Sequence, residues 1–272
     1  MSQMNAVSHQ KRSNHKRNYS ICLLLSTILL LQSCSNLLIG DRAETSGHDQ
    51  KPTLPKDYID QYENLSLLFK AQFKSKLLKI DEGTKKYLNG IAAKIFKYNE
   101  IFLGQSSDLE FVILDDDLPF FFSLPSGTIF FSSSLLKKYI KSERVFQAII
   151  ALEIYKISHG TFIRKTVVPL GYTSLNQLIA ISRLPVDFKV EIDKWAFYLL
   201  KRSGMDPTAV LSLIQIINKH ALEFSFHNGE YASLSREEYL FKSFIVKESL
   251  SMEIAEDSKN SSGGFYNLIR GL

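Results

Sequence analysis

The chain has 272 residues, of which 45% are apolar, and its formal net charge is +5. This length and composition are typical of one sizeable globular domain with short appendages. Residues 1–33 contain four basic residues and no acidic one, so the rest of the chain has 29 of the 33 basic residues and all 28 acidic ones. Because that remainder is nearly neutral, its charge gives no reason to predict nucleic-acid binding.

Residues 1–33 have the pattern of a secretory signal. A basic stretch precedes the apolar run Ile21–Leu31, which is too short for a helix that spans a bilayer of about 30 Å. The sequence Leu31–Cys34 (LQSC) resembles a bacterial lipobox, in which the cysteine is acylated and becomes the mature N-terminus; an ordinary signal or anchor with an incidental cysteine is the alternative. Ser35 after the cysteine resembles lipoproteins of the outer membrane. We therefore predict an outer-membrane lipoprotein of the bacterial cell envelope, anchored through Cys34 and facing the periplasm.

The chain after Cys34 begins with a polar segment. Residues 34–56 contain several glycines and prolines and are interpreted as a flexible tether, and residues 57–272 as one domain. The only other cysteine is Cys22 in the signal, so no disulfide is expected in the domain. Helical patterns cover Asp57–Ile80 and Thr84–Tyr98, and the second pattern places Tyr98 on its apolar face. Both helices are expected to pack on a central helix.

Strand patterns follow between Asp108 and Ser134. Leu109–Asp117 is an apolar run that ends in three aspartates, and Phe120–Phe122 and Ile129–Phe131 are separated by the turn sequence Pro125–Gly127. The aspartates 115–117 are interpreted either as a solvated cluster at a strand end, which we favour, or as a cation site.

The central helix is predicted at Val145–Gly160, with apolar residues at three- and four-residue steps and with Ser142 at the N-cap position. Glu153 lies beside its apolar stripe and must be paired or solvated. Thr161–Asp187 is expected to be a loop with a short helix that covers a cleft. A second helix is predicted at Asp187–Arg202, with Gly204 as its C′ residue.

Two more helices are expected towards the C-terminus. Asp206 and Pro207 are predicted as the N-cap and first residue of one helix. Ser235 and Glu238 have the spacing of a capping box for a long helix that ends near Ala255.

The order of these motifs resembles the HtpX-type zinc metallopeptidases (peptidase family forty-eight), which include bacterial lipoproteins. In that family a strand leads to N-A-F-x-L-P-G-G-x-I, a short helix and a helix with H-E-x-x-H. Six residues fit the first motif: Phe122, Ser123, Leu124, Pro125, Gly127 and Ile129. Phe120 and Ser126 depart from it. Trp195–Pro207 matches the family's helix ending in G-x-D-P. The resemblance covers roughly residues 58–217, and it implies an α+β fold: a mostly helical, gluzincin-like domain with a small β-sheet beside the site helix.

The metal motif itself is altered. Glu153 stands at the position of the family's catalytic glutamate, and Asp193 stands at the aspartate of its E-x-x-x-D motif. The three ligand positions hold Leu152, Lys156 and Lys189 instead of two histidines and a glutamate. A catalytic zinc needs three protein ligands with free lone pairs, and neither leucine nor a charged lysine provides one. We therefore expect no metal cofactor at this position.

Two functions are compatible with this pattern. The first is a non-catalytic, peptidase-like lipoprotein that binds peptides or envelope proteins, with a peptide adding to the strand edge at Gly127, Ile129 and Phe131. The second is a working zinc metalloendopeptidase of envelope protein quality control, with a site rebuilt from His159, His220 and Glu153. If the scaffold is that of the family, Lys156 and Lys189 approach the place of the ion, near Glu153 and Asp193, and we expect their charges to replace that of the ion. The alternative is that both lysines extend into solvent.

Overall fold

The computed structural model describes residues 56–101, 109–159, 174, 175, 179, 183–224, 231–248 and 261–272. All described residues belong to one compact unit, Lys51–Leu272. The predicted signal (1–33), the predicted lipidation site Cys34 and nearly all of the predicted tether (34–56) lie outside the described residues. No helix in the described ranges is both long and apolar enough to cross a membrane.

Three strands form a small mixed sheet in the order β1–β3–β2, with β1 parallel and β2 antiparallel to β3. The strands are β1 (Glu110–Leu114), β2 (Phe121–Ser123) and β3 (Thr128–Ser132). The turn between β2 and β3 is the predicted one: the Leu124 amide donates to the Thr128 carbonyl, and the Gly127 amide donates to the Leu124 carbonyl, both at 3.0 Å. Gly127 has φ +88°, which explains why glycine occupies this position.

The prediction that the strand after this turn offers a free edge to a peptide is wrong. β3 is the middle strand, so its backbone is already paired with β1 on one side and β2 on the other. Ile129 and Phe131 are fully buried, and Gly127 is buried as well. A peptide adds only to a strand whose backbone groups are unpaired, so these three residues cannot bind one in this way.

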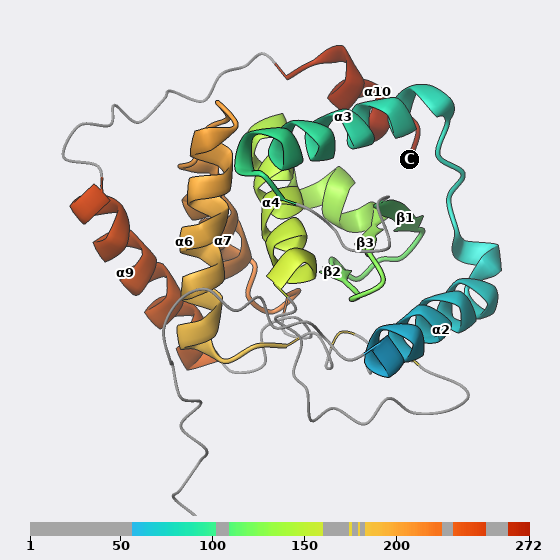
Figure 1. Cartoon of the computed structure of the whole chain (residues 1–272), viewed down its shortest axis with the longest axis horizontal. Helices are drawn as coiled ribbons and strands as arrows, with labels where there is room; N and C mark the ends of the chain where they lie inside the picture. The colour runs from blue at the N-terminus through green and yellow to red at the C-terminus, as the bar shows by residue number, and fades with distance from the viewer. Residues whose placement is uncertain are drawn as a thin grey trace, which may run out of the picture. The chain divides into compact units, whose positions relative to one another are not determined.

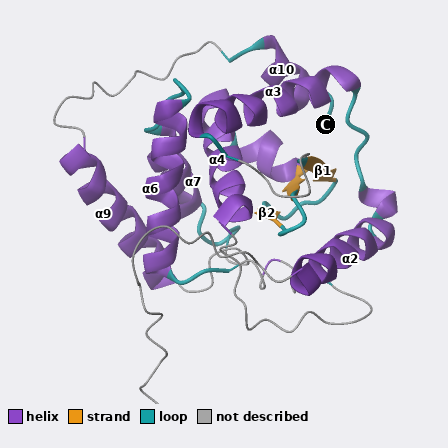
Figure 2. Ribbon diagram, viewed as in Figure 1, coloured by secondary structure: helices purple, strands orange, loops and turns teal. Residues whose placement is uncertain are grey.

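The rest of the described chain is mostly helical (Figure 2), as the predicted α+β class requires. The helices are α2 (Lys56–Gln72), α3 (Glu82–Asn99), α4 (Glu143–His159), α6 (Val186–Arg202), α7 (Ala209–Lys219), α9 (Tyr231–Glu248) and α10 (Gly263–Arg270), with short helical turns η1 (Lys74–Lys76) and η2 (Leu135–Tyr139). α4 is the predicted central helix and packs against α3, α6, α7 and β2 (Figure 1). α9 covers α6 and α7, and α10 packs on α3.

The two faces of the sheet are buried in different clusters because side chains alternate along a strand. One face joins the main core around α4, and the other packs against Tyr62, Leu65 and Phe69 of α2. The prediction that α2 packs on α4 is therefore wrong. Its predicted extent is also too long, since Leu77 forms an antiparallel bridge with Leu114. Of the predicted cleft-covering segment (161–187), residues 174, 175, 179 and 183–187 are described. Leu175 and Ile179 belong to the α2 cluster, whereas Leu184 packs against the main core.

The predicted end of α6 is confirmed in detail. Gly204 has φ +61°, its amide donates to the Lys201 carbonyl at 3.1 Å, and the Met205 amide donates to the Leu200 carbonyl at 3.0 Å. These two bonds are the pair of a Schellman motif, which satisfies carbonyls at the end of a helix.

Three predicted details of the other helices are wrong. α7 begins at Ala209 rather than Pro207, although Asp206 makes the bond expected of an N-cap: its Oδ1 accepts from the Thr208 amide at 2.8 Å. α9 already includes Tyr231, so Ser235 lies inside the helix and caps nothing. Tyr98, predicted on the apolar face of α3, is 53% exposed.

Candidate functional site

A small cavity of about 70 Å³ lies among α4, α6, α7, α9 and β2. Its wall is apolar apart from five ionisable side chains, which we call the ionic cluster: Glu153, Lys156, Lys189, Asp193 and Glu237. Leu152 also lines the cavity. The structure therefore brings together all five positions that the sequence assigned to the altered metal site and adds one carboxylate, Glu237.

The two packed helices explain why these side chains converge. Glu153 and Lys156 are three residues apart on α4, and Lys189 and Asp193 are four residues apart on α6, so each pair shares one helix face. α4 packs directly against α6, which directs the two pairs into the same space. The apolar part of the wall is formed by Phe121, Leu152, Leu184, Ile192, Leu213, Ile214 and Ile217.

Glu153 and Lys156 form a buried ion pair. The Lys156 Nζ lies 2.6 Å from the Glu153 Oε2, Glu153 is fully buried, and the Lys156 side chain is 10% exposed. Neither oxygen of Glu153 has a hydrogen-bond partner among the described residues, so the contact is an ion pair rather than a directed hydrogen bond. A buried carboxylate in this position depends on the neighbouring ammonium group.

The second half of the cluster contains Lys189, Asp193 and Glu237. The Lys189 Nζ lies 3.6 Å from the Glu237 Oε2. Burial raises the pKa of Asp193 well above its usual value, the charge of Glu237 raises it further, and Lys189 opposes both. Burial also raises the pKa of Glu237, again against the effect of Lys189. Both pKa shifts favour the neutral forms of Asp193 and Glu237, because burial disfavours a charged carboxylate.

Glu237 is not among the site residues that the sequence motifs predict. The neighbouring Glu238 was predicted in a capping box, whereas in the structure it lies at the surface of the α7–α9 contact and accepts from the Asn218 side-chain amide. A signal for Glu237 was available, because Leu234 and Phe241 lie three and four residues away on the same helix face and are buried. An acid between two buried apolar residues at helical spacing faces the core.

The residues of the cluster do not fit zinc. Three carboxyl groups line the cavity, but two ammonium groups lie with them and would repel a cation. Among the described residues, no group of three or more His, Cys, Asp or Glu side chains is placed to hold a metal ion.

The hypothesis of a site rebuilt from His159, His220 and Glu153 is wrong for these residues. His159 stacks on Tyr155, with ring centroids 4.1 Å apart, and the His220 ring contacts Tyr139 at 5.0 Å. The two histidines therefore belong to separate aromatic contacts, and His220 does not line the cavity that contains Glu153.

The three aspartates after β1 each contact a different side chain and do not converge on one position. Ser133 Oγ donates to Asp115 at 2.9 Å, and Asp116 pairs with Lys76 at 2.9 Å. Asp117 lies 3.8 Å from the Lys138 Nζ and is fully exposed. This arrangement agrees with the solvated strand-end cluster.

Comparison of the chain with models of known protein families and with curated proteins found no match.

Proposed function

We propose that this chain is a non-catalytic relative of the HtpX-type, gluzincin-like zinc metallopeptidases, in which a buried ionic cluster replaces the metal. The observation that supports the proposal is the cavity itself. Glu153, Lys156, Lys189 and Asp193 were assigned to one altered metal site from sequence motifs more than thirty residues apart, and they line one cavity of about 70 Å³.

The chemistry of the cluster argues against hydrolysis at this position. A peptidase glutamate of this type activates a water that is bound to zinc, so it needs both the ion and access to solvent. Glu153 is instead paired with Lys156 at 2.6 Å and is fully buried. The cavity has room for about two water molecules and none for a peptide.

The proposed biological role is binding rather than catalysis. We propose that the chain is an outer-membrane lipoprotein, anchored through Cys34, that binds a peptide or an envelope protein partner from the periplasmic side. The partner does not add to β3 as an extra strand, because the backbone of β3 is already paired with β1 and β2. A protein that keeps a packed peptidase scaffold but lacks the reacting groups retains only its surfaces for function.

Restoring the ligands tests the proposal directly. The triple variant Leu152→His/Lys156→His/Lys189→Glu of residues 35–272 recreates two imidazoles and a carboxylate at the three ligand positions. We expect it to bind about one equivalent of zinc, while the wild-type protein, purified without chelator, contains far less and does not cleave casein.

Two results would contradict the proposal. Stoichiometric zinc or chelator-sensitive cleavage in the wild-type protein would show that other residues form a working site. A folded triple variant that binds no zinc would show that the three positions do not have metallopeptidase geometry. Circular dichroism of the variant separates this second result from a failure to fold.

A further inference from the structure

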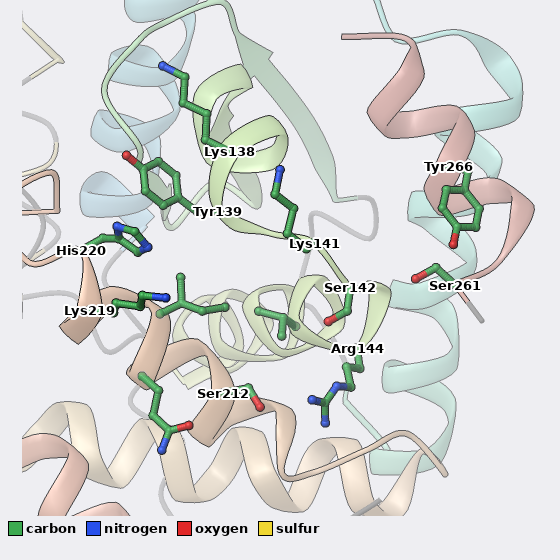
Figure 3. Close-up of a pocket in the computed structure, with 13 residues that line it drawn as sticks. Lys138, Tyr139, Lys141, Ser142, Arg144, Ser212, Lys219, His220, Ser261 and Tyr266 are labelled. Atoms are coloured by element: carbon green, nitrogen blue, oxygen red, sulfur yellow. The ribbon is translucent and has the colours of Figure 1, made fainter. Parts of the chain in front are cut away.

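A second and larger cavity, of about 670 Å³, lies between the η2–α4 connection, α7 and α10 (Figure 3). Its volume falls within the range of about 300–1,000 Å³ that is usual for small-molecule sites. It shares no residue with the cavity of the ionic cluster. We call it the basic groove; it is lined by Lys138, Tyr139, Lys141, Ser142, Arg144, Val145, Ser212, Gln215, Ile216, Lys219, His220, Ser261 and Tyr266.

The charges of the groove are all of one sign. Among the described residues, four lysine or arginine side chains line it and no carboxylate does. Arg144 is paired with Asp206 at 2.9 Å, and Lys138 lies 3.8 Å from Asp117. In the part of the chain that the structure describes, Lys141 and Lys219 have no carboxylate partner within ion-pair distance. These two ammonium groups, which come from different walls, are available for an anion.

Figure 3 shows how the walls are arranged. Lys141 extends from the connection before α4, and Lys219 lies with His220 at the end of α7 on another side. The Lys138 ammonium points away from the other labelled residues. Lys141 also donates to the Lys137 carbonyl, which uses one of the three protons of its ammonium group.

Neutral donors complete the groove. Hydroxyl groups come from Tyr139, Ser142, Ser212, Ser261 and Tyr266. The first turn of α4 also borders the groove, and the N-terminus of a helix carries a partial positive charge that favours anions.

The acidic residue in the first turn of α4, Glu143, points away from the groove. The Glu143 carboxylate accepts hydrogen bonds from the Tyr87 hydroxyl at 2.9 Å and the Ser262 hydroxyl at 2.8 Å, and so it faces α3 and α10. Glu223 lies 3.9 Å from His220, at the Lys219 end of the groove, but its carboxylate is not among the described side chains that line the groove.

We propose that the basic groove binds a small polar molecule that carries phosphate, with Lys141 on one wall and Lys219 on another as its counter-charges. Lysines bind phosphate as point charges, and hydroxyl groups donate to its remaining oxygens. The same chemistry is present in a soluble phosphate ester and in a phospholipid headgroup. The proposal is independent of the zinc question, because none of its residues belongs to the ionic cluster.

The test uses the full chain, purified in detergent micelles, with two probes measured by isothermal titration calorimetry. Inorganic pyrophosphate represents soluble phosphates, and dihexanoyl phosphatidylglycerol represents a phospholipid headgroup; dihexanoyl phosphatidylcholine is the zwitterionic control. The variant Lys141→Gln/Lys219→Gln is compared with Lys85→Gln/Lys94→Gln, which removes two exposed lysines of α3 and changes the net charge equally.

We expect the groove variant to bind the active probe at least about tenfold more weakly than wild type, since each charge-assisted hydrogen bond contributes roughly that factor. The α3 variant should bind within about twofold of wild type. Binding of the lipid probe alone identifies a headgroup site, and binding of pyrophosphate identifies a site for soluble phosphates. Absence of binding by either probe, or equal losses in the two variants, would overturn the proposal.

Discussion

Replacement of Glu153 by alanine tests whether the ionic cluster stabilises the fold. Glu153 is fully buried, and its Oε2 lies 2.6 Å from the Nζ of Lys156, whose side chain is 10% exposed. At this distance two unit charges attract each other by about 6 kcal/mol at an effective dielectric constant of 20, and desolvation of both charges offsets part of this energy. The variant leaves the ammonium group buried without its carboxylate. We expect the free energy of unfolding to fall by about 3–5 kcal/mol.

The assay is urea unfolding of residues 35–272, and the chain contains its own control. Glu191 and Lys194 on α6 have the same three-residue spacing and lie 2.5 Å apart, but their side chains are 56% and 30% exposed. Glu191→Ala should therefore cost less than about 1 kcal/mol. Glu153→Gln keeps the shape of the side chain, so it separates the loss of charge from the cavity that alanine leaves.

A second comparison isolates the ion pair. Glu153→Leu/Lys156→Met removes both charges, and it should recover most of the stability that Glu153→Ala loses, because no charge is left buried without a partner. Lys189→Ala tests the other half of the cluster, where Glu237 would lose its ammonium group. If Glu153→Ala and Lys189→Ala both change the free energy of unfolding by less than about 1 kcal/mol, the ionic cluster does not replace the metal as a structural link.

Three further predictions concern other parts of the chain. Burial raises the pKa of Asp193, so the folded state keeps a proton that the unfolded state loses above pH about 4, and the free energy of unfolding of the wild type falls as pH rises towards the folded pKa. Asp193→Asn should remove this fall. A difference in unfolding free energy between the two proteins that does not grow with pH would contradict the prediction. A Cβ at Gly264 would lie 2.4 Å from the Tyr87 ring, whereas a Cβ at Gly263 meets no described atom within 4 Å. Gly264→Ala should therefore lower the stability measured by thermal unfolding by about 1–3 kcal/mol, and Gly263→Ala should not. Equal effects of the two substitutions would rule out the close packing of α10 on α3. Cys34→Ala should abolish fatty-acid labelling of the full chain, and labelling that persists in this variant would refute the predicted lipid anchor.

Local patterns in the sequence were sufficient to predict most of the helices and strands. Hydrophobic periodicity located α4 and α6, and alternating apolar runs with Pro125–Gly127 located β2, β3 and the turn between them. Gly204 indicated the end of α6, because a left-handed residue after a helix is a local requirement that glycine meets. These features depend on a few neighbouring residues, and the chain specifies them without reference to the rest of the fold.

Local sequence patterns do not predict whether the side chains of the ionic cluster are buried. Motif positions identified Glu153, Lys156, Lys189 and Asp193, but the sequence left open whether the lysines extend into solvent. That choice depends on α9, which covers α6 and α7 and contributes Glu237 from more than forty residues further along the chain. Burial then raises the pKa of Asp193 and leaves each lysine close to a carboxylate.

The order of the strands in the sheet also depends on contacts between distant parts of the chain. The sequence correctly indicated that residues 128–132 form a strand after a tight turn, and we expected that strand to have a free edge. The parallel pairing of β1 with β3 places β3 in the middle and buries Ile129 and Phe131. Periodicity shows which side of an element is apolar, but only tertiary packing determines which element covers that side, because the covering residues come from distant parts of the chain.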